Sequence, residues 1–523
     1  MIPNWDILLD EASLAALLPR EYSHFARPIR DGLSLFLSGL SATRQAAILR
    51  AQASLPVTAP FSQRLGSLAQ HSPVLQKLGQ VLARDQRLSR ELRYYLSELE
   101  SLPPTVPLET IQATLSEELG PLERRGVTLL PPAVAEASVA VVIPFRQAGD
   151  DTCPDGVFKL LKPGIEQQLD DELSLLETIG QHLDARCDEL GIPHLDYQDA
   201  FQQVRSKLWD EVELDNEQRH LTRAREFFAD EPQVCVPALL EHCTSRVTAM
   251  ERVRGCKVTG HGLDGGRPKR RLARLIAKAL IAKPVFSESE QALFHADPHA
   301  GNLFYTEDQR LAILDWSLVG ALGVRERTAI VQVLTGAITL DGARIARVMG
   351  KLADERLDEN ALQAVVDLAV KRIRQGQFPG LPWLIQLLDE AVQHARLRVA
   401  PDLMLFRKSL LTLEGVVADV GSADGQIDRT LSLEFLRQFA IEWPQRWFHL
   451  PYSRNFPTRL SNLDVAHTMM SYPATVARFW TGQAADALEA CVSRWESDLK
   501  PALTNGKNTL STEPCQTAQG ARE

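Results

Sequence analysis

Three polar side chains in one short stretch have the types and spacing for phosphoryl-transfer chemistry. The segment FHADPHAGNLFYTEDQRLAILDWSLVG, residues 294–320, contains Asp297, Asn302 and Asp315. A carboxylate and an amide oxygen are hard ligands of the kind that Mg²⁺ prefers beside phosphate groups. A second carboxylate can orient or deprotonate the attacking hydroxyl or water. We therefore predict that Asn302 and Asp315 are metal ligands and that Asp297 is a catalytic residue.

A hairpin should bring these side chains together. Residues 302–306 and 310–314 are short apolar runs, and residues 307–309 read as a polar turn between them. Folding the chain back at that turn would place Asn302 and Asp315 at the same end of the two strands. An ordinary hairpin with polar ends is the simpler interpretation, but the Asp–Asn spacing, the hairpin and the second aspartate all agree.

The same segment resembles a known signature. HADPHAGN followed by LAILDWSLVG is similar to the HADPHPGN…DFG signature of the UbiB/AarF family of atypical kinase-like proteins, the ubiquinone-biosynthesis kinase type. Soluble small-molecule phosphotransferases of the aminoglycoside and choline kinase type share the shorter pattern H-x-D-x-x-x-x-N…D-W. The UbiB/AarF resemblance implies ATP and Mg²⁺ as cofactors. It also implies an α+β, two-lobed protein-kinase-like fold with an N-terminal helical extension and a helical C-terminal tail.

A lysine inside an apolar strand is the next candidate. Lys159 lies in GVFKLLKPGI between Phe158 and Leu160, where an unpaired cation is costly. In kinases a strand lysine grips the α- and β-phosphates, whereas a lysine that faces solvent on an edge strand is the alternative. The passage resembles the family's VAVKVQRPGI, which implies that Lys159 is a catalytic and nucleotide-binding residue.

Two further segments resemble nucleotide-binding parts of the family. AEAS, residues 135–138, lacks the glycines of an ordinary phosphate-binding loop but is similar to the family's Ala-rich AAAS loop. Residues 250–251 resemble the family's hinge, whose backbone would meet adenine. Besides Lys159, the nucleotide-binding residues implied are Ala135, Ala137, Ser138, Met250 and Glu251.

An upstream helix carries the sequence Lys-x-Gly-Gln. Residues 72–85 have apolar side chains at helical spacing, interrupted by Lys77, Gly79 and Gln80. A glycine in the middle of a helix costs about 1 kcal/mol relative to alanine, so Gly79 indicates the close approach of another group. This KxGQ motif is a hallmark of the UbiB/AarF family. The resemblance implies that Lys77 and Gln80 reach into the nucleotide site.

The sequence ELDNEQRH, residues 213–220, resembles the family's ExD motif. The resemblance implies that Glu213 and Asp215 meet Lys77 and so tie the extension to the core. In this register Arg219 stands where the family has the glutamate that pairs with the strand lysine. Glu217 lies two residues earlier, and would face another side of the helix.

Glu136 is a second departure from the family pattern. It replaces the middle alanine of the Ala-rich loop and would add a negative charge near the phosphates. Together with the arginine at position 219, it keeps open the interpretation that the chain is a regulator that binds nucleotide without turnover.

Composition excludes several function classes. The 523 residues carry a net charge of −10 and a pI of about 5.7, which argues against a nucleic-acid partner. No run reaches the length of a membrane span, and the N-terminus does not resemble a secretory signal. Seven scattered cysteines without CxxC spacing fit a reducing compartment. We therefore expect a cytoplasmic protein without a transmembrane helix, and a membrane surface remains open as a peripheral partner.

The motifs suggest an order of domains. We expect helical extensions over residues 1–60 and 61–130, an N-lobe over 131–255, a C-lobe over 256–425, a helical tail over 426–502 and disorder over 503–523. The leading prediction is an ATP/Mg²⁺-dependent kinase or ATPase, and the family resemblance adds quinone or other isoprenoid lipid metabolism. A nucleotide-binding regulatory pseudokinase and a soluble small-molecule phosphotransferase are the alternatives.

Overall fold

The computed structural model describes residues 5, 8–83, 87–100, 105–148, 156–194, 197–260, 266–353, 357–421, 426–486 and 488. Two compact units divide this part of the chain. The first contains the described parts of Met1–Ala279, His295–Gly320 and Leu411–Asp424, and it includes every candidate site residue. The second contains Leu280–Phe294, Ala321–Leu410 and Gly425–Glu523. The predicted disorder over residues 503–523 concerns a segment outside the described residues.

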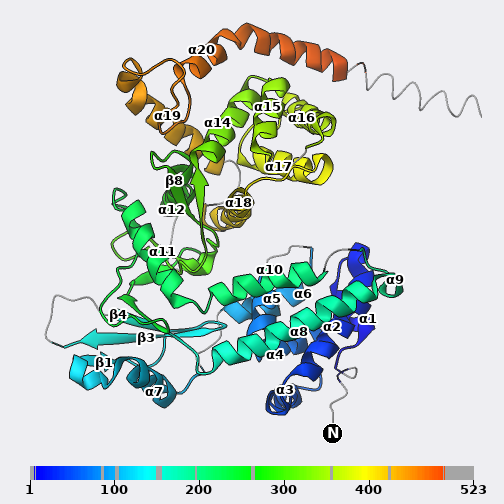
Figure 1. The fold of residues 1–523 in the computed structure, drawn as a ribbon, viewed down its shortest axis with the longest axis vertical. Coiled ribbons are helices and arrows are strands. Elements are labelled where there is room, and N and C mark those ends of the chain that lie inside the picture. The colour runs from blue at the N-terminus through cyan, green and yellow to red at the C-terminus, as the bar shows by residue number, and fades with distance from the viewer. Residues whose placement is uncertain are drawn as a thin grey trace, which may run out of the picture. The chain divides into compact units, whose positions relative to one another are not determined.

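Helices make up much of the first unit, with α1 to α7 before the first four strands and α8 to α12 after them (Figure 1). They are α1 (Glu11–Leu17), α2 (Ala26–Gly39), α3 (Ala42–Ser54), α4 (Phe61–Ala69), α5 (Pro73–Ala83), α6 (Arg90–Ser97), α7 (Leu108–Leu119), α8 (Ile165–Ala185), α9 (Cys187–Leu190), α10 (Tyr197–Asp210), α11 (Leu214–Phe227) and α12 (Gly266–Ala277). Helix α8 packs against α2, α5 and α10, and their apolar side chains share one core.

Helix α5, which carries the KxGQ motif, is held at its N-terminus by Glu172 of α8. This fully buried carboxylate accepts hydrogen bonds from Ser72 Oγ at 2.7 Å and from the backbone N–H of Val74 at 3.0 Å. Arg44 pairs with the same carboxylate. A carboxylate at a helix N-terminus satisfies free N–H groups and complements the helix dipole. The position of α5 along its axis is therefore fixed by a charged, hydrogen-bonded contact.

Gly79 lies where α5 meets α6 and the turn that follows it. A Cβ atom at this glycine would lie 2.6 Å from Leu99 Cδ1 and 3.2 Å from Leu96 Cδ2. Both distances are shorter than ordinary carbon–carbon contact. The close approach predicted from the sequence is therefore confirmed, and it is an approach of core leucines.

The Gly79→Ala variant should accordingly be less stable than the wild type. Overpacking a core costs about 1–3 kcal/mol, and the better helix propensity of alanine returns about 1 kcal/mol. We expect a net loss of about 1 kcal/mol in the free energy of unfolding, measured by urea denaturation. Gly415→Ala is the matched control, because no atom lies within 4 Å of the Cβ position in that exposed helical site. A stabilised Gly79→Ala variant would show that the leucines are free to move aside.

A mainly antiparallel sheet follows the helical extension. Its strands are β1 (Val127–Leu129), β2 (Ala135–Glu136), β3 (Ala140–Gln147), β4 (Gly156–Leu161) and β6 (Val247–Glu251). The order is β1-β3-β4-β6, with β2 paired to β3. Val142, Lys159 and Thr248 lie side by side on the three longest strands. Helix α7 packs its apolar side chains onto β3 and β4, which explains why β4 is buried along nearly its whole length.

A second sheet contains the predicted hairpin. Its strands are β5 (Val234–Cys235), β10 (Leu311–Ile313), β9 (Leu303–Thr306) and β7 (Gly255–Lys257), in that order. Strands β9 and β10 are antiparallel, with Tyr305 opposite Leu311 and Leu303 opposite Ile313. Strand β8 (Gln291–His295) precedes this hairpin in the sequence and β11 (Val319–Gly323) follows it. These two strands pair with each other in a separate two-stranded sheet.

The second unit is helical, as predicted for the residues after 320. Its helices are α13 (Lys283–Val285), α14 (Val324–Ile338), α15 (Gly342–Leu352), α16 (Glu359–Arg374), α17 (Leu381–Ala395), the N-terminal part of α18 (Pro401–Gly421), α19 (Gln426–Arg446) and α20 (Asn462–Met470). A further helix covers residues 472–486 and has Pro473 in its first turn, where proline is tolerated. Over the described residues, no helix has the length and apolar character needed to cross a membrane.

Candidate active site

The β9–β10 hairpin brings Asn302 and Asp315 to the same end of its two strands. The backbone N–H of Leu314 donates to the carbonyl of Asn302 at 2.8 Å, so the two candidate ligands directly flank this closing hydrogen bond. Gln309 turns the chain with a φ of 62°, and its N–H donates to the carbonyl of Thr306. The predicted hairpin geometry is therefore confirmed.

Asp315 has a backbone conformation that most residues avoid. Its φ is 54°, in the left-handed region, where aspartate and asparagine are the least disfavoured non-glycine residues. The carboxylate accepts a hydrogen bond from the backbone N–H of Ser317 at 3.3 Å. Backbone strain of this kind occurs mostly at functional sites, where the surrounding structure holds it in place.

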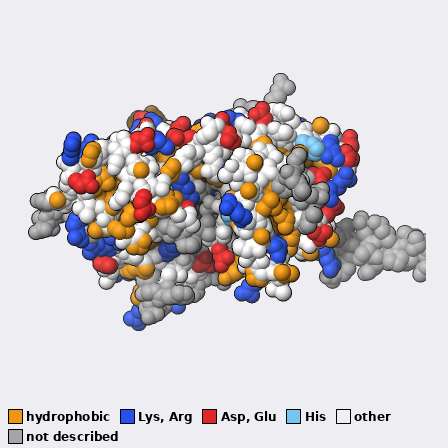
Figure 2. Space-filling view, turned by 90° about the horizontal axis from the view of Figure 1, so that it is seen from below, with side chains coloured by type: hydrophobic (Ala, Val, Ile, Leu, Met, Phe, Trp, Pro, Cys, Tyr) orange, Lys and Arg blue, Asp and Glu red, His pale blue; other side chains and the backbone are white. Residues whose placement is uncertain are grey.

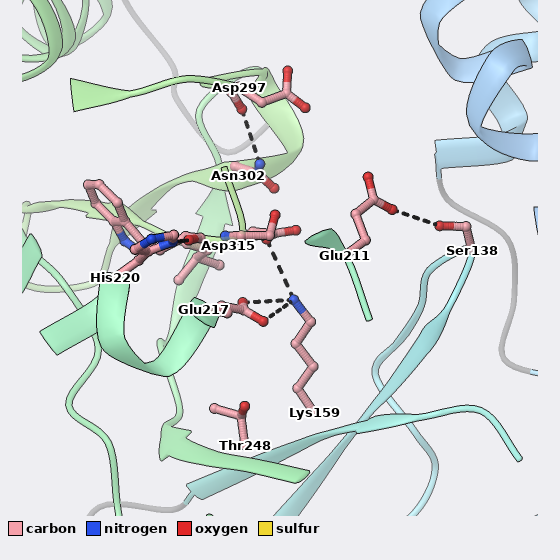
Figure 3. A network of polar contacts seen from close by, with 12 residues as sticks. Ser138, Lys159, Glu211, Glu217, His220, Thr248, Asp297, Asn302 and Asp315 are labelled. Carbon is pink, nitrogen blue, oxygen red and sulfur yellow. Dashed lines mark hydrogen bonds and ion pairs between the residues drawn. The ribbon is translucent and has the colours of Figure 1, made fainter. Parts of the chain in front are cut away.

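Asn302 is turned so that its amide oxygen is the group presented to a ligand. Its Nδ2 donates to the backbone carbonyl of Asp297 at 3.2 Å, and the residue is nearly buried (Figure 3). The side chain of Asp297 lies at the start of the same loop, with one carboxylate oxygen 3.9 Å from Nε2 of His299. The amide oxygen and the Asp315 carboxylate form a hard donor set that fits Mg²⁺ with phosphate and water as its other ligands.

No group of three or more His, Cys, Asp or Glu side chains in the described ranges is arranged to hold a metal ion. The candidate set here is smaller and includes an amide. Such sets are ordinary where a nucleotide supplies part of the metal's coordination.

His295 joins the two segments that carry these ligands. Its Nε2 lies 3.1 Å from the carbonyl of Leu314 and 2.9 Å from that of Asp315, so this nitrogen carries the proton. Its Nδ1 accepts from the backbone N–H of Asp297 at 3.2 Å. Trp316 packs edge-on against the ring. The neutral imidazole thus aligns the Asp297 loop with the Asp315 segment.

The ring of His295 should make the fold sensitive to acid. Burial lowers its pKa below the ordinary value, although nearby carbonyls and carboxylates partly oppose this. The unfolded chain therefore takes up a proton at about pH 6.5 while the folded chain does not, so stability is lost as the pH falls below that value. Between about pH 7.5 and pH 5.5, the melting temperature of the His295→Gln variant should fall by less than that of the wild type.

Exposed His394 supplies the control for this comparison. A His394→Gln variant should follow the pH dependence of the wild type. Equal acid sensitivity of wild type and His295→Gln would show that other groups control the acid limit.

Lys159 forms the centre of the polar network (Figure 3). Its Nζ donates to both carboxylate oxygens of Glu217 at 2.7 and 2.8 Å and lies 3.5 Å from Oδ1 of Asp315. Burial alone would lower the pKa of Lys159, but the carboxylates of Asp315 and Glu217 outweigh it and raise the pKa above the usual lysine range. Conversely, Lys159 holds the pKa of Asp315 below its usual range despite the effect of burial. Both groups are therefore charged at neutral pH.

Asp315 is also the most accessible member of this group. Its side chain is 41% exposed, against 12% for Lys159 and 5% for Glu217. A buried lysine held by one buried glutamate can present its charge toward a second, accessible carboxylate. That arrangement suits a site where phosphate and metal enter from the side of Asp315.

The glutamate that pairs with Lys159 corrects the predicted register. Leu214, Glu217, Leu221 and Ala224 form the buried face of α11, at helical spacing. Arg219 points to solvent, where it bonds to Asn216 and to the carbonyl of Asp215. The expectation that Glu217 would face another side of the helix was wrong. The apolar spacing of α11 was the signal that could have identified the inward position.

The acidic partners predicted for Lys77, Glu213 and Asp215, were also wrong, because the acid that pairs with it lies two residues before Glu213. Lys77 pairs with Glu211, whose other oxygen accepts from Ser138 Oγ at 3.4 Å. Glu213 immediately precedes α11 without a side-chain capping hydrogen bond, and Asp215 lies in the first turn of the helix. Both acids are exposed. Sequence analysis missed Glu211 as well as the role of Glu217.

Lys77 itself lies toward the site, as predicted. Burial by itself would lower its pKa, but the carboxylates of Glu211, Asp297 and Asp315 outweigh that effect and raise it. Gln80 does not reach the same place, since its amide donates to the carbonyl of Leu99 at 3.0 Å. The lysine of the motif therefore faces the polar network, while its glycine and glutamine pack the extension together.

The Ala-rich loop is short, and its first two residues form a β-strand. Ala135 and Glu136 form β2, the N–H of Ala137 donates to the carbonyl of Ala140 at 2.8 Å, and Ser138 is buried. This places only Ser138 in contact with a residue of the polar network.

Glu136 is not a free charge in that loop. It pairs with Lys162 at 2.7 Å and accepts hydrogen bonds from Thr105, and its side chain is 8% exposed. Although burial would raise the pKa of Glu136, Lys162 and Thr105 lower it. The expectation of an uncompensated negative charge near the phosphates is therefore not supported by this geometry.

Met250 and Glu251 end strand β6, next to β4. The backbone N–H of Glu251 donates to the carbonyl of Ala238 at 2.9 Å, so it is already used within the fold. The backbone N–H groups of Arg252 and Val253, immediately after the strand, make no hydrogen bond to any described residue.

Comparison with known proteins identifies a kinase-like domain in this chain. The profile of the ABC1 atypical kinase-like domain matches residues 98–349. A probable protein kinase UbiB of Marinobacter nauticus is 25% identical over 371 residues, covering 67% of this chain and 65% of the relative. The chloroplastic protein ACTIVITY OF BC1 COMPLEX KINASE 1 of Arabidopsis thaliana is 28% identical over 66% of this chain and 51% of its own. The chain thus spans less than two thirds of these two relatives.

Among solved structures, the complex of Rv3197 with erythromycin from Mycobacterium tuberculosis covers 73% of this chain and 95% of its own. Its TM-score is 0.44 and its sequence identity is 16%. An uncharacterised chloroplastic aarF domain-containing protein kinase of Arabidopsis thaliana is 29% identical over 74% of this chain and 70% of the relative.

The fold and the comparisons therefore agree on an α+β, kinase-like domain with helices before and after it. Residues 98–349 of this chain match the ABC1 atypical kinase-like domain, and the chain is similar to UbiB proteins, which are probable protein kinases, over about two thirds of its length.

Proposed function

We propose that the protein is an enzyme that uses Mg²⁺ and ATP for phosphoryl transfer, to a small molecule or to water. The observation that carries this proposal is the network in which Lys159 bonds to Glu217 and lies 3.5 Å from Asp315. In kinases a charged lysine, oriented by a glutamate, holds the nucleotide phosphates, and an accessible aspartate holds the metal that neutralises them.

Each residue of the site has a role in this proposal. Lys159 binds phosphate oxygens, while Asn302 and Asp315 hold Mg²⁺, which would neutralise charge that develops on the phosphates. Asp297 orients the attacking hydroxyl or water and accepts its proton. His295 is a positioning residue, because it bonds to the backbone on both sides of the loop without facing a ligand.

The geometry gives less support to a regulator without turnover. That alternative was motivated by Glu136 and Arg219, but Glu136 is paired with Lys162 and the glutamate position is filled by Glu217. A soluble phosphotransferase was motivated by the Asp315-Trp316 pair. Trp316 is fully buried and donates its Nε1–H to the carbonyl of Ile313, so it serves packing and gives no information on the substrate.

The substrate class rests on resemblance alone. Similarity to UbiB proteins suggests quinone or other isoprenoid lipid metabolism, which is an analogy at the level of the family. We propose a prenylated phenol or a related lipid as the first acceptor to examine.

Phosphate release from Mg-ATP by the full chain tests the proposal. It should be measured with and without lipid vesicles and a prenylated phenol, beside an Asp297→Asn variant. Release that depends on Asp297 supports an enzyme, and an increase with lipid supports the substrate class. An ATP-induced rise in melting temperature without any release would favour the regulator. Transfer of the γ-phosphate to an aminoglycoside or to choline would favour the phosphotransferase.

A further inference from the structure

Exposed apolar side chains gather in the C-terminal segment. Residues 426–488 hold more than half of the large apolar side chains that are exposed in the described chain. They are Leu433, Leu436, Ile441, Trp443, Trp447, Phe448, Leu450, Tyr452, Leu463, Met469, Met470, Tyr472, Val476, Phe479, Trp480 and Leu488. By contrast, on the molecular face shown in Figure 2 the apolar side chains are interspersed with Lys, Arg, Asp and Glu. A large apolar surface on a folded protein normally marks an interaction site.

The helix over residues 472–486 separates its contacts from its apolar face. Thr475 and Arg478 donate to the carbonyl of Thr339 at 3.3 and 2.9 Å, which ties one face to the end of α14. Tyr472, Val476 and Trp480 follow one another at intervals of four residues and are exposed. This is the pattern of a surface-lying amphipathic helix.

The residues after α19 are held rigidly while their apolar side chains face outward. Arg446 pairs with buried Glu442 at 2.6 Å, and Thr458 donates to the same carboxylate at 2.7 Å. The guanidinium of Arg446 also lies between the rings of Phe439 and Phe456. This network closes the loop 447–457 onto α19.

Trp447 and Phe448 are carried by that closed loop and are 76% and 90% exposed. A loop that is held in place by a buried ion pair and still exposes two adjacent large aromatic residues is presented for contact, because folding alone would favour their burial.

The most exposed charged side chains of this segment are arginines. Its acids, Asp428, Glu434, Glu442, Asp464 and Asp486, are all buried or partly buried in hydrogen bonds and ion pairs. Arg429, Arg437 and Arg454 are exposed, the last two while paired with Glu434 and Asp464. A surface with Trp, Tyr and Met side chains, exposed arginines and no fully exposed carboxylate among its described residues fits an anionic lipid surface.

We propose that residues 426–486 form an interfacial surface that docks the protein onto an anionic lipid bilayer, with the aromatic side chains inserted at the headgroup level. Aromatic rings with a polar edge are favoured at this depth, and arginine side chains can extend toward lipid phosphates. This proposal does not depend on the proposed catalytic activity, since it concerns binding alone.

Vesicle binding by the full chain tests the proposal. The protein should co-sediment with vesicles of phosphatidylcholine and phosphatidylglycerol, and less with phosphatidylcholine alone. The double variants Trp447→Ser with Phe448→Ser, and Tyr472→Ser with Trp480→Ser, should each bind vesicles about 10-fold more weakly. Phe378→Ser is the matched control, because Phe378 is 59% exposed in the same unit but outside the segment. That variant should bind like the wild type.

Charge and depth can be measured separately. Arg429→Gln with Arg437→Gln should remove most of the preference for anionic vesicles while binding through the aromatic residues persists. Brominated acyl chains should quench tryptophan fluorescence in the wild type and less in the Trp447 and Trp480 variants. Equal vesicle binding by all variants, or no binding by the wild type, would overturn the proposal. So would light scattering that shows a dimer lost on the same substitutions, since a second copy would then cover the surface.

Discussion

Replacing Asp315 by asparagine should reduce Mg²⁺-dependent phosphate release from ATP by about 100-fold or more. The substitution keeps the shape of the side chain and removes the charge that would hold the metal. Asparagine also tolerates the positive φ of this position, so the backbone should keep its conformation. Lys159 retains both of its bonds to Glu217, and the fold should therefore remain intact.

Nucleotide binding gives a second measurement on the same variant. In the wild type, Mg²⁺ should increase the affinity for ATP, and in Asp315→Asn the affinity should be nearly independent of Mg²⁺. Asp171→Asn removes an equal charge from an exposed position on α8 and should behave like the wild type in both assays. Unchanged turnover in Asp315→Asn would remove this residue from the metal site.

The second large effect is expected at Glu217. Glu217→Gln should lower turnover about 100-fold, because Lys159 would lose the carboxylate that orients it, and small misplacements of such groups are costly. The same change should lower the free energy of unfolding by about 1–3 kcal/mol, since a buried charged hydrogen bond is lost. Asp315 still faces the ammonium group, which limits this loss of stability.

Arg219→Gln is the matched control for Glu217, because it lies two residues further on the exposed face of the same helix. It should leave turnover and stability nearly unchanged, as surface substitutions usually do. Steady-state phosphate release and urea unfolding measure both quantities. A large loss of turnover at Arg219 with little effect at Glu217 would restore the register predicted from the sequence and contradict the geometry described above.

The hairpin shows what local sequence can decide. Its strands, its turn and the adjacency of Asn302 and Asp315 follow from contacts between residues close together in the chain. Alternating apolar residues and a polar turn contain the information needed for such a contact. The helices of the extension also follow from local apolar spacing. The close packing at Gly79 could be predicted because a glycine inside a helix lowers helix stability unless a neighbouring group needs the space.

The partners of the two lysines show where local sequence is insufficient. Lys159 and Glu217 are 58 residues apart, and Lys77 is still further from Glu211. Motif similarity placed the acidic motif two residues too late, because several acids crowd residues 211–217 and any of them could match it. Only the buried face of α11, set by its packing against β6, selects the inward one.

The sequence alone therefore predicted the kinase-like signature, the helical extension and the hairpin, and it identified Asp297, Asn302 and Asp315 as candidate site residues. Tertiary structure alone decided which acid faces each lysine, that Glu136 is neutralised by Lys162, and that the aromatic residues after α19 face outward. The physical reason is the range of the interactions involved. Hydrogen bonds within a hairpin or helix depend on neighbours in the chain, whereas burial, ion pairing and exposure depend on segments that meet only when the whole unit folds.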